Sequence, residues 1–288
     1  MNAQEFHSSR QFTETPCGRI AHVERGEGPV ALFVHGLPLC GFQWRYQMED
    51  LAPIRKCVAP DLMGVGYTEP NKGQDISFES QAKMLAAFLD ARGIAEVDLV
   101  GNDTGGGVSQ IFAATHPRRI RTLTLTNCEV SNLWPNQMLQ QFYGALKSGA
   151  IGEAFKAMAT NEALAQQQLG GAVFENPASL TAEMAGVYFG PFAESADRRE
   201  QVRGFADALK NRDQLVAAGS RLKESKFPSQ VIWGDADTAF DTPGSLEWLR
   251  GNIGGMRRVI TVPGAKLFWP EEHPRVLSTL LKDFWNAN

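Results

Sequence analysis

The sequence predicts an α/β fold with a mostly parallel, doubly wound sheet, and three observations carry this prediction. Short apolar runs recur along the chain and have the composition of strands that are buried on both faces. Helical patterns lie between these runs, and alternating strands and helices build right-handed βαβ units. Between about residues 131 and 226, helical periodicity replaces the alternation. The chain is therefore expected to form one α/β core with an inserted helical segment.

The strand signals begin with a hairpin around residues 16–18, because the flanking segments RQFTET and GRIAHVERG alternate in polarity. Helices are expected over 76–92, where apolar side chains recur at helical spacing and Gly93 follows the last turn, and also over 108–115 and 271–285. The apolar runs that predict buried strands cover residues 30–34, 56–60, 97–100, 122–125, 230–233 and 258–262.

The helical insertion is rich in Ala, Gln, Met and Leu and contains no convincing strand. An insertion of this size between two strands of a parallel sheet is expected to cover the strand ends as a cap. The sequence thus predicts an α/β core of residues 1–130 and 226–288, and a helical cap of residues 131–225.

Composition narrows the possible functions. A chain of 288 residues with 43% hydrophobic and 21% charged residues fits a globular protein. A net charge of -4 without a basic block argues against nucleic-acid and anionic membrane partners. The start has no secretion signal, and the cysteines lack the C-x-x-C spacing of zinc sites. We therefore expect a cytoplasmic monomer or homodimer that acts on a small molecule and needs no metal or cofactor.

The most informative segment is VGNDTGGG at residues 100–107, where a buried strand runs directly into a helix. A residue on so tight a turn is held in a strained backbone conformation, and its neighbours two positions away must be small. Such a turn lifts the side chain of Asp103 above the sheet. It also directs backbone N–H groups and the helix N-terminus at the same point.

Further motifs occur in order along the chain. They are HGLP at residues 35–38 with Trp44-Arg45 after it, DLMGVG at 61–66, GDAD at 234–237, and PGAKLF at 263–268 with PEE at 270–272. Together with the turn at Asp103, these motifs resemble the α/β-hydrolase superfamily, and within it the Asp-nucleophile branch of haloalkane dehalogenases and epoxide hydrolases. The likeness runs nearly end to end, and it implies the α/β-hydrolase fold with an inserted cap.

The resemblance also implies residue roles. In that branch an Asp attacks an electrophilic carbon to form an ester, and a His then activates the water that cleaves it. Asp103 corresponds to the nucleophile and Asp237 to the acid that orients the His. The backbone N–H groups of Leu37 and Thr104 correspond to the oxyanion hole. The substrate pocket is expected to contain His35, Trp44, Asn102, Asn127, Tyr143, Tyr188 and Leu267, with the two tyrosines as candidate proton donors from the cap.

The catalytic His of that branch is missing. Its motif P-G-x-G-H-F reads PGAKLF here, and Leu267 stands at the His position. Lys266 is either a surface lysine or an ion-pair partner of Asp237 that acts as the base with a lowered pKa. His273, six residues further on, reads as the start of a helix. Alternatively, Asp103 and Asp237 face each other in an apolar pocket, which leaves one carboxyl protonated.

Two further differences concern halide release. Dehalogenases place an Asn and a Trp, both donors to the departing halide, where this chain has Leu37 and Thr104. Each missing charge-assisted hydrogen bond is worth about 1.5–3 kcal/mol. The sequence therefore disfavours dehalogenation.

Three hypotheses remain open at this stage. The first is a hydrolase that attacks a small, mostly apolar electrophile (an epoxide, an ester or lactone, or a haloalkane) through Asp103 with a non-standard water activator. The second is a lyase or cyclase that uses Asp103 as general acid and base without a covalent intermediate. The third is a ligand-binding protein that retains the cavity without turnover.

Overall fold

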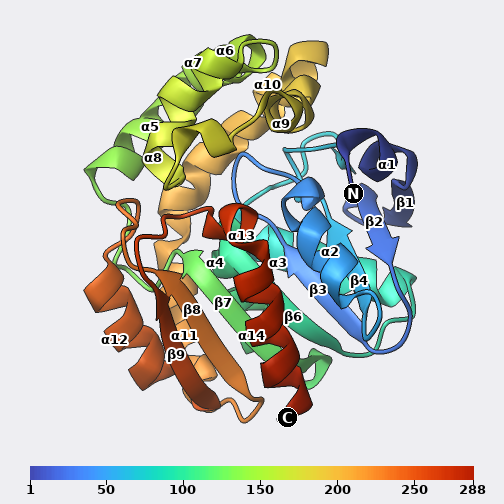
Figure 1. Cartoon of the computed structure of the whole chain (residues 1–288), viewed down its shortest axis with the longest axis vertical. Helices are drawn as coiled ribbons and strands as arrows, with labels where there is room; N and C mark the ends of the chain where they lie inside the picture. The colour runs from blue at the N-terminus through green and yellow to red at the C-terminus, as the bar shows by residue number, and fades with distance from the viewer.

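A nine-stranded sheet forms the centre of the molecule (Figure 1). The computed structural model covers residues 1–288 and describes the side chains of residues 1–207 and 212–288. The strand order is β1-β2-β4-β3-β6-β7-β8-β9, and β5 pairs with β2. The strands are β1 (Gln11–Thr15), β2 (Gly18–Arg25), β3 (Val30–Val34), β4 (Lys56–Pro60), β5 (Glu69–Pro70), β6 (Val97–Asp103), β7 (Ile120–Cys128), β8 (Ser229–Gly234) and β9 (Met256–Val262).

From β4 to β9 along this order, all neighbouring strands pair in parallel, while β1, β2 and β5 pair antiparallel. The central strands β3, β6, β7 and β8 are nearly or completely buried along their length, as the continuous apolar runs predict. The expected mostly parallel, doubly wound sheet is confirmed, and its carboxyl edge brings the ends of β6 and β7 side by side.

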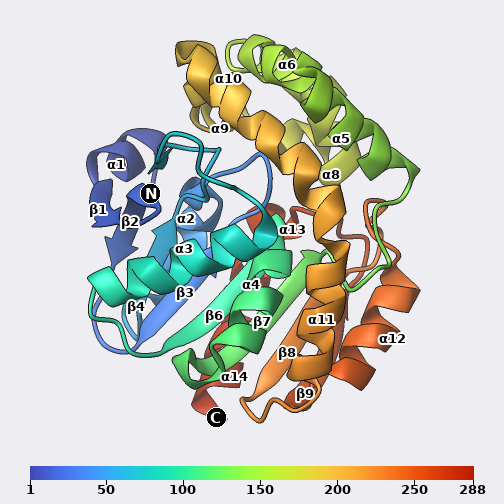
Figure 2. The ribbon, with the colours of Figure 1, turned by 180° about the vertical axis from the view of Figure 1, so that it is seen from behind.

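Helices cover both faces of the sheet (Figures 1 and 2). On one face lie α2 (Arg45–Leu51) and α14 (Pro274–Asn286), which pack against each other. On the other face, α3 (Phe78–Ala91) and α11 (Arg212–Leu222) both pack against α4 (Thr104–Thr115). Further helices are α1 (Ala3–Ser8), α12 (Thr242–Asn252) and α13 (Trp269–Glu272). The helix expected over 108–115 begins earlier, at Thr104, and the one expected over 271–285 is divided between α13 and α14.

The cap lies over the carboxyl edge of the sheet (Figure 1). Its helices are α5 (Gln137–Ser148), α6 (Ala150–Met158), α7 (Glu162–Ala165), α8 (Gly171–Val173), α9 (Ala182–Glu194) and α10 (Ala196–Val202). The segment η5 (Arg203–Asn211) then leads from α10 to α11, and Figure 2 shows this helical run descending from the cap to the core.

The end of the predicted cap, residue 225, needs correction. Helix α11 falls inside the expected range 131–225, yet it packs against α4 beside the sheet. Leu215, Ala218 and Leu222 are its buried face. Helical periodicity marks which face of α11 is apolar but does not say whether that face meets the cap or the core.

Candidate functional site

The turn between β6 and α4 holds Asp103 in an unusual backbone conformation, with φ 52° and ψ -131°. The close packing around the turn explains its glycines. A Cβ on Gly105 would lie 2.2 Å from the carbonyl oxygen of Val34, and one on Gly101 would lie 2.5 Å from the hydroxyl of Ser109. Strain of this kind persists only where the surroundings impose it, and it is concentrated at functional sites. The turn predicted from the sequence is present.

The carboxylate of Asp103 is held by the backbone N–H groups that were expected to form an oxyanion hole. The Leu37 N–H donates to Oδ2 of Asp103 at 2.7 Å, and the Thr104 N–H also hydrogen-bonds the carboxylate. The approach is so close that a Cβ on Gly36 would lie 2.7 Å from this side chain. The two backbone N–H groups thus fix the position of the carboxylate at the turn.

Asp103 forms part of the wall of a small, largely apolar cavity between the core and the cap. Its volume is about 130 Å³. The core contributes Asp103 with its neighbour Thr104, and the cap contributes Tyr143. The remaining lining residues are Leu37, Pro38, Met138, Leu139, Phe142, Gln168, Leu169, Ala172, Val173, Ala239, Leu267 and Phe268. The cavity therefore suits a small, mostly apolar molecule that presents one reactive group to Asp103.

Burial makes Asp103 a weak acid. Loss of solvation raises its pKa to about 7, the N–H groups of Thr104 and Leu37 oppose this shift, and the charge of Asp237 adds to it. A carboxyl of this kind changes its protonation state near neutral pH, where a general acid or base is most effective.

Asp237 stands behind the cavity and does not line it. Burial raises its pKa to about 6, against four donors that stabilise the anion. The Asn127 side chain donates to Oδ2 at 2.8 Å, the Ala239 N–H to Oδ1 at 2.8 Å, and the N–H groups of Thr238 and Phe240 also contribute. Asp237 is therefore a buried carboxyl whose anion is stabilised by protein donors, and it ionises before Asp103.

Asn127 is a supporting residue and does not line the cavity. Besides Asp237, its side chain donates to the carbonyl of Gly234 and accepts from the N–H groups of Gly234 and Trp269. Asn102, also expected in the pocket, is fully buried and bonds to Gln43 and to the Leu267 carbonyl instead. Both amides fix the loops around the carboxylates, so the expectation that they line the pocket was wrong in detail.

Leu267, at the position of the missing His, does line the cavity together with Asp103. No histidine is among the residues that line this cavity. His35 is fully buried, with Nδ1 at 2.9 Å from the Gly36 carbonyl and Nε2 accepting the Leu62 N–H at 2.9 Å. His273 faces Glu175 at 3.0 Å. The expectation of His35 in the pocket is corrected, because both of its nitrogens tie loops together.

Three other expected site residues lie elsewhere. The Lys266 ammonium donates to the Gly171 carbonyl of the cap at 2.8 Å in an exposed hydrogen bond and does not pair with Asp237. Trp44 packs in the core against Phe33. Tyr188 donates to Glu271, which forms a buried ion pair with Arg45 at 2.6 Å. Burial makes an unpaired Glu271 charge costly, and this explains why Tyr188 turns towards it and away from the cavity.

Sequence reasoning missed Glu129, a fully buried carboxyl at the end of β7. Cys128 pairs with Asp103 across the two strands, so the next residue stands beside the elbow. The Thr104 hydroxyl is 3.4 Å from Oε1 of Glu129, and Oε2 has no hydrogen-bond partner. Burial raises the pKa of Glu129 well above its ordinary value, and the charge of Asp103 raises it further. The available signal was an acidic residue directly after a buried strand next to the elbow strand.

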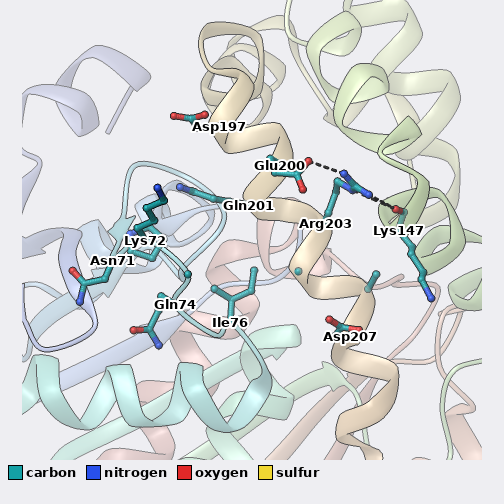
Figure 3. A pocket seen from close by; sticks show the side chains of 14 residues that line it. Asn71, Lys72, Gln74, Ile76, Lys147, Asp197, Glu200, Gln201, Arg203 and Asp207 are labelled. Carbon is teal, nitrogen blue, oxygen red and sulfur yellow. Dashed lines mark hydrogen bonds and ion pairs between the residues drawn. The ribbon is translucent and has the colours of Figure 1, made fainter.

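A larger hollow of about 960 Å³ lies elsewhere, between the loop around residues 70–76 and the helical run α10–η5 (Figure 3). It is open and polar, and it is bordered by side chains of both charges, among them Lys72, Glu200 and Arg203. Arg203 is occupied by Glu200 at 2.7 Å and by the carbonyl of Lys147. The enclosed cavity at Asp103 is therefore the better candidate for chemistry.

Comparison with known proteins agrees with the fold. Residues 29–271 match the family described as alpha/beta hydrolase fold. Haloalkane dehalogenase 2 of Mycobacterium tuberculosis is 26% identical over 285 residues, 97% of this chain and 93% of that protein. Epoxide hydrolase 2 of Siraitia grosvenorii is 26% identical over 294 residues, 90% and 92% of the two chains. A cis-3-alkyl-4-alkyloxetan-2-one decarboxylase of Shewanella oneidensis is 26% identical over 255 residues, 83% and 77% of the two chains.

Among solved structures, the haloalkane dehalogenase DbeA of Bradyrhizobium elkani superposes with a TM-score of 0.79 at 24% identity, covering 97% of this chain and 99% of that one. In the described part of the chain, no helix has the length and hydropathy needed to cross a membrane. The expectation of an enzyme with the α/β-hydrolase fold is confirmed at the level of family and relatives. The chain belongs to the alpha/beta hydrolase fold family.

Proposed function

We propose that the protein is a hydrolase that attacks a small, mostly apolar electrophile through the carboxylate of Asp103. The observation that carries the proposal is the carboxylate itself. It is fixed on a strained turn by the N–H groups of Leu37 and Thr104, and it borders a small, mostly apolar cavity. A buried carboxylate is a stronger nucleophile than a solvated one, because it has less hydration to lose.

The two N–H groups also suit the second half of such a reaction. After Asp103 has formed an ester with the substrate, water attacks the ester carbonyl and negative charge develops on its oxygen. Oδ2 of Asp103 already accepts the Leu37 N–H, and the Thr104 N–H also hydrogen-bonds this carboxylate, so the developing charge meets its donors without reorganisation. One such donor is worth about 10²–10³ in rate in acyl-transfer enzymes.

Relatives suggest the type of electrophile. The chain is similar to an epoxide hydrolase, to haloalkane dehalogenases and to an oxetanone decarboxylase. These names refer to an epoxide, a haloalkane and an oxetanone, each of which has a reactive carbon–oxygen or carbon–halogen bond. The small volume and apolar lining of the cavity fit such substrates. Water activation proceeds without the usual imidazole, because Leu267 occupies its position.

A second function is favoured by the pair of buried carboxyls. If Glu129 holds a proton next to an ionised Asp103, the pair could catalyse an elimination or cyclisation by proton transfer without an ester intermediate. Such a lyase would form its product without taking up an oxygen atom from water.

The test is turnover of a panel of small epoxides, lactones and haloalkanes in heavy-oxygen water, followed by mass spectrometry of the peptide that carries Asp103. We expect heavy oxygen to accumulate in this peptide over several turnovers, and the D103N variant to be inactive. Turnover without label in the peptide would refute the nucleophile. A product that contains no oxygen from water would favour the lyase. No turnover with any compound, together with stabilisation by these ligands on heating, would favour a binding protein.

A further inference from the structure

The carboxyl of Glu129 is buried next to the turn at Asp103, and its neighbour is the hydroxyl of Thr104, a residue that lines the cavity. Thr104 lines the cavity, and its hydroxyl is 3.4 Å from Oε1 of Glu129. Oε2 is buried without any hydrogen-bond partner. A charged oxygen in that situation would be very costly, so Glu129 is a carboxyl that needs a proton. The backbone carbonyl of the same residue is tied down by the Gln110 side chain at 2.7 Å.

The two neighbouring carboxyls differ in how well they tolerate charge. Asp103 receives two backbone N–H groups on its carboxylate, whereas one oxygen of Glu129 has no donor. When the pair holds one proton, the negative charge therefore settles on Asp103 and the proton on Glu129. This distribution leaves a nucleophile and an acid side by side.

We propose that Glu129, acting through the Thr104 hydroxyl, delivers and recovers the one proton that this reaction requires, and that turnover is thereby restricted to electrophiles whose departing oxygen takes up a proton, such as epoxides, and excludes haloalkanes. The proposal rests on the nucleophilic role of Asp103 argued above. Glu129 would then both protonate the departing oxygen and accept a proton from the attacking water.

The first step consumes the proton. The ionised Asp103 attacks a ring carbon of the epoxide, and the carbon–oxygen bond of the ring breaks with its electron pair leaving on oxygen. That oxygen takes the proton of the Thr104 hydroxyl, which takes the proton of Glu129. The products are a neutral ester on Asp103, an alcohol group on the substrate, and an ionised Glu129.

The second step restores the proton. Water gives a proton to the Thr104 oxygen while the Thr104 hydroxyl proton returns to Glu129, and the hydroxide adds to the ester carbonyl of Asp103. The tetrahedral oxyanion then collapses, and the hydroxyl proton moves to the departing alcohol oxygen. A diol leaves, Asp103 is again a carboxylate, and Glu129 is again protonated. Atoms and charge balance over the cycle.

A haloalkane cannot run this cycle. Halide leaves as an anion without taking a proton, so Glu129 stays protonated after Asp103 has been alkylated. No base is then available to activate water, and the ester persists. The described site therefore predicts a functional difference between two kinds of electrophile that the nucleophile alone would not distinguish.

The first experiment compares variants on a small epoxide such as styrene oxide. We expect E129Q and T104V to lower kcat/KM by about 10²–10⁴-fold, the usual contribution of general acid–base catalysis. T104S keeps the hydroxyl and should recover kcat/KM by at least about tenfold relative to T104V, as a hydroxyl role in general acid–base catalysis requires. E27Q, at an exposed glutamate, is the matched control. Thermal melting establishes that each variant is folded. If E129Q does not fold, the comparison of T104V with T104S still tests the proposal.

The second experiment follows halide release from 1-iodobutane by the unmodified protein. We expect release to stop at or below one equivalent per chain. Continued release, or E129Q and T104V with wild-type epoxide turnover, would overturn the role of Glu129. The heavy-oxygen experiment keeps the two proposals apart. If the Asp103 peptide is labelled while E129Q remains active, only the proposed proton role of Glu129 is refuted. If the peptide is never labelled, the nucleophilic role of Asp103 is refuted as well.

Discussion

Two tyrosines of the cap differ in what their hydroxyl groups can do. Tyr143 lines the cavity, and burial raises its pKa, with further contributions from the charges of Glu129 and Asp103. Tyr188 instead donates to Glu271 in the interior. The sequence offered both as proton donors, since helical spacing alone does not tell which one reaches the substrate. Only Tyr143 is placed to assist the chemistry.

We therefore expect Y143F and Y188F to separate activity from stability. Y143F should lower kcat/KM on an epoxide by about tenfold with little change in melting temperature, because a hydroxyl facing the cavity adds little to folding. Y188F should leave kcat within about threefold and lower the unfolding free energy by roughly 1–3 kcal/mol, because Glu271 loses a buried partner. Steady-state kinetics and urea unfolding measure both. The reverse pattern would assign the assisting hydroxyl to Tyr188.

Leu267 offers a direct test of what the missing imidazole would do. In the L267H variant an imidazole would enter the cavity wall next to Asp103. We expect L267H to release more than one equivalent of iodide from 1-iodobutane, because the new base can activate water at the alkylated Asp103. Halide release followed over time distinguishes it from wild type. If L267H also stops at one equivalent, position 267 does not present its side chain to the ester.

The turn between β6 and α4 was the most predictable element of the site. Its small residues are forced by backbone contacts, so they leave a clear pattern in the sequence. Glu129 left no such pattern, because its role arises from the pairing of β6 with β7 and from a hydroxyl of another element. The prediction for Lys266 was wrong because it relied on position in the sequence alone. Lys266 neighbours the vacant His position in sequence, but its long side chain reaches the cap.

The same turn predicts how glycine substitutions behave. In G105A the new Cβ would lie 2.2 Å from the carbonyl oxygen of Val34. This oxygen belongs to the backbone of a buried strand and cannot move aside, so we expect the unfolding free energy to fall by at least about 3 kcal/mol. G186A is the matched control in the cap helix α9, where a Cβ meets open space and should stabilise by about 0.5–1 kcal/mol. Urea unfolding of both variants checks this, and equal stability would contradict the packing at the turn.

At the scale of the whole molecule, buried carboxyls make stability depend on pH. The folded-state pKa of Asp103 is about 7, far above the value of about 3.9 in an unfolded chain. The folded protein thus binds a proton that the unfolded chain has released. Its contribution to stability is fully present below the unfolded pKa and is lost as pH rises towards 7. The pKa values of the buried His22 and His35 are lowered, so their contribution to stability increases as pH rises.

The comparison with D103N removes the titration of Asp103 and its effect on Glu129, whereas the contributions of His22 and His35 cancel, because Asp103 is not among the charges that shift their pKa values. Between pH 5 and 7 we expect wild type to lose up to about 1.4 kcal/mol of unfolding free energy per pH unit relative to D103N. Urea unfolding at several pH values gives this difference directly. If the two proteins keep a constant difference, Asp103 is ionised throughout in the folded state.

Most of the architecture followed from the sequence because buried parallel strands and amphipathic helices have distinct patterns, as β3 and α3 illustrate. The boundary of the cap did not, since α11 has the same kind of apolar face as the cap helices but uses it against α4. What an apolar helix face meets is decided by the assembled molecule and not by its own sequence.

The path of the chain behind Glu129 has one more consequence. This residue directly follows β7 and begins the segment that leads into α5, and Thr104 begins the helix against which α11 packs after the chain returns from the cap. The proposed acid therefore stands where the chain passes from the core into the cap. The position of the cap and the surroundings of Glu129 are thus linked through the chain itself.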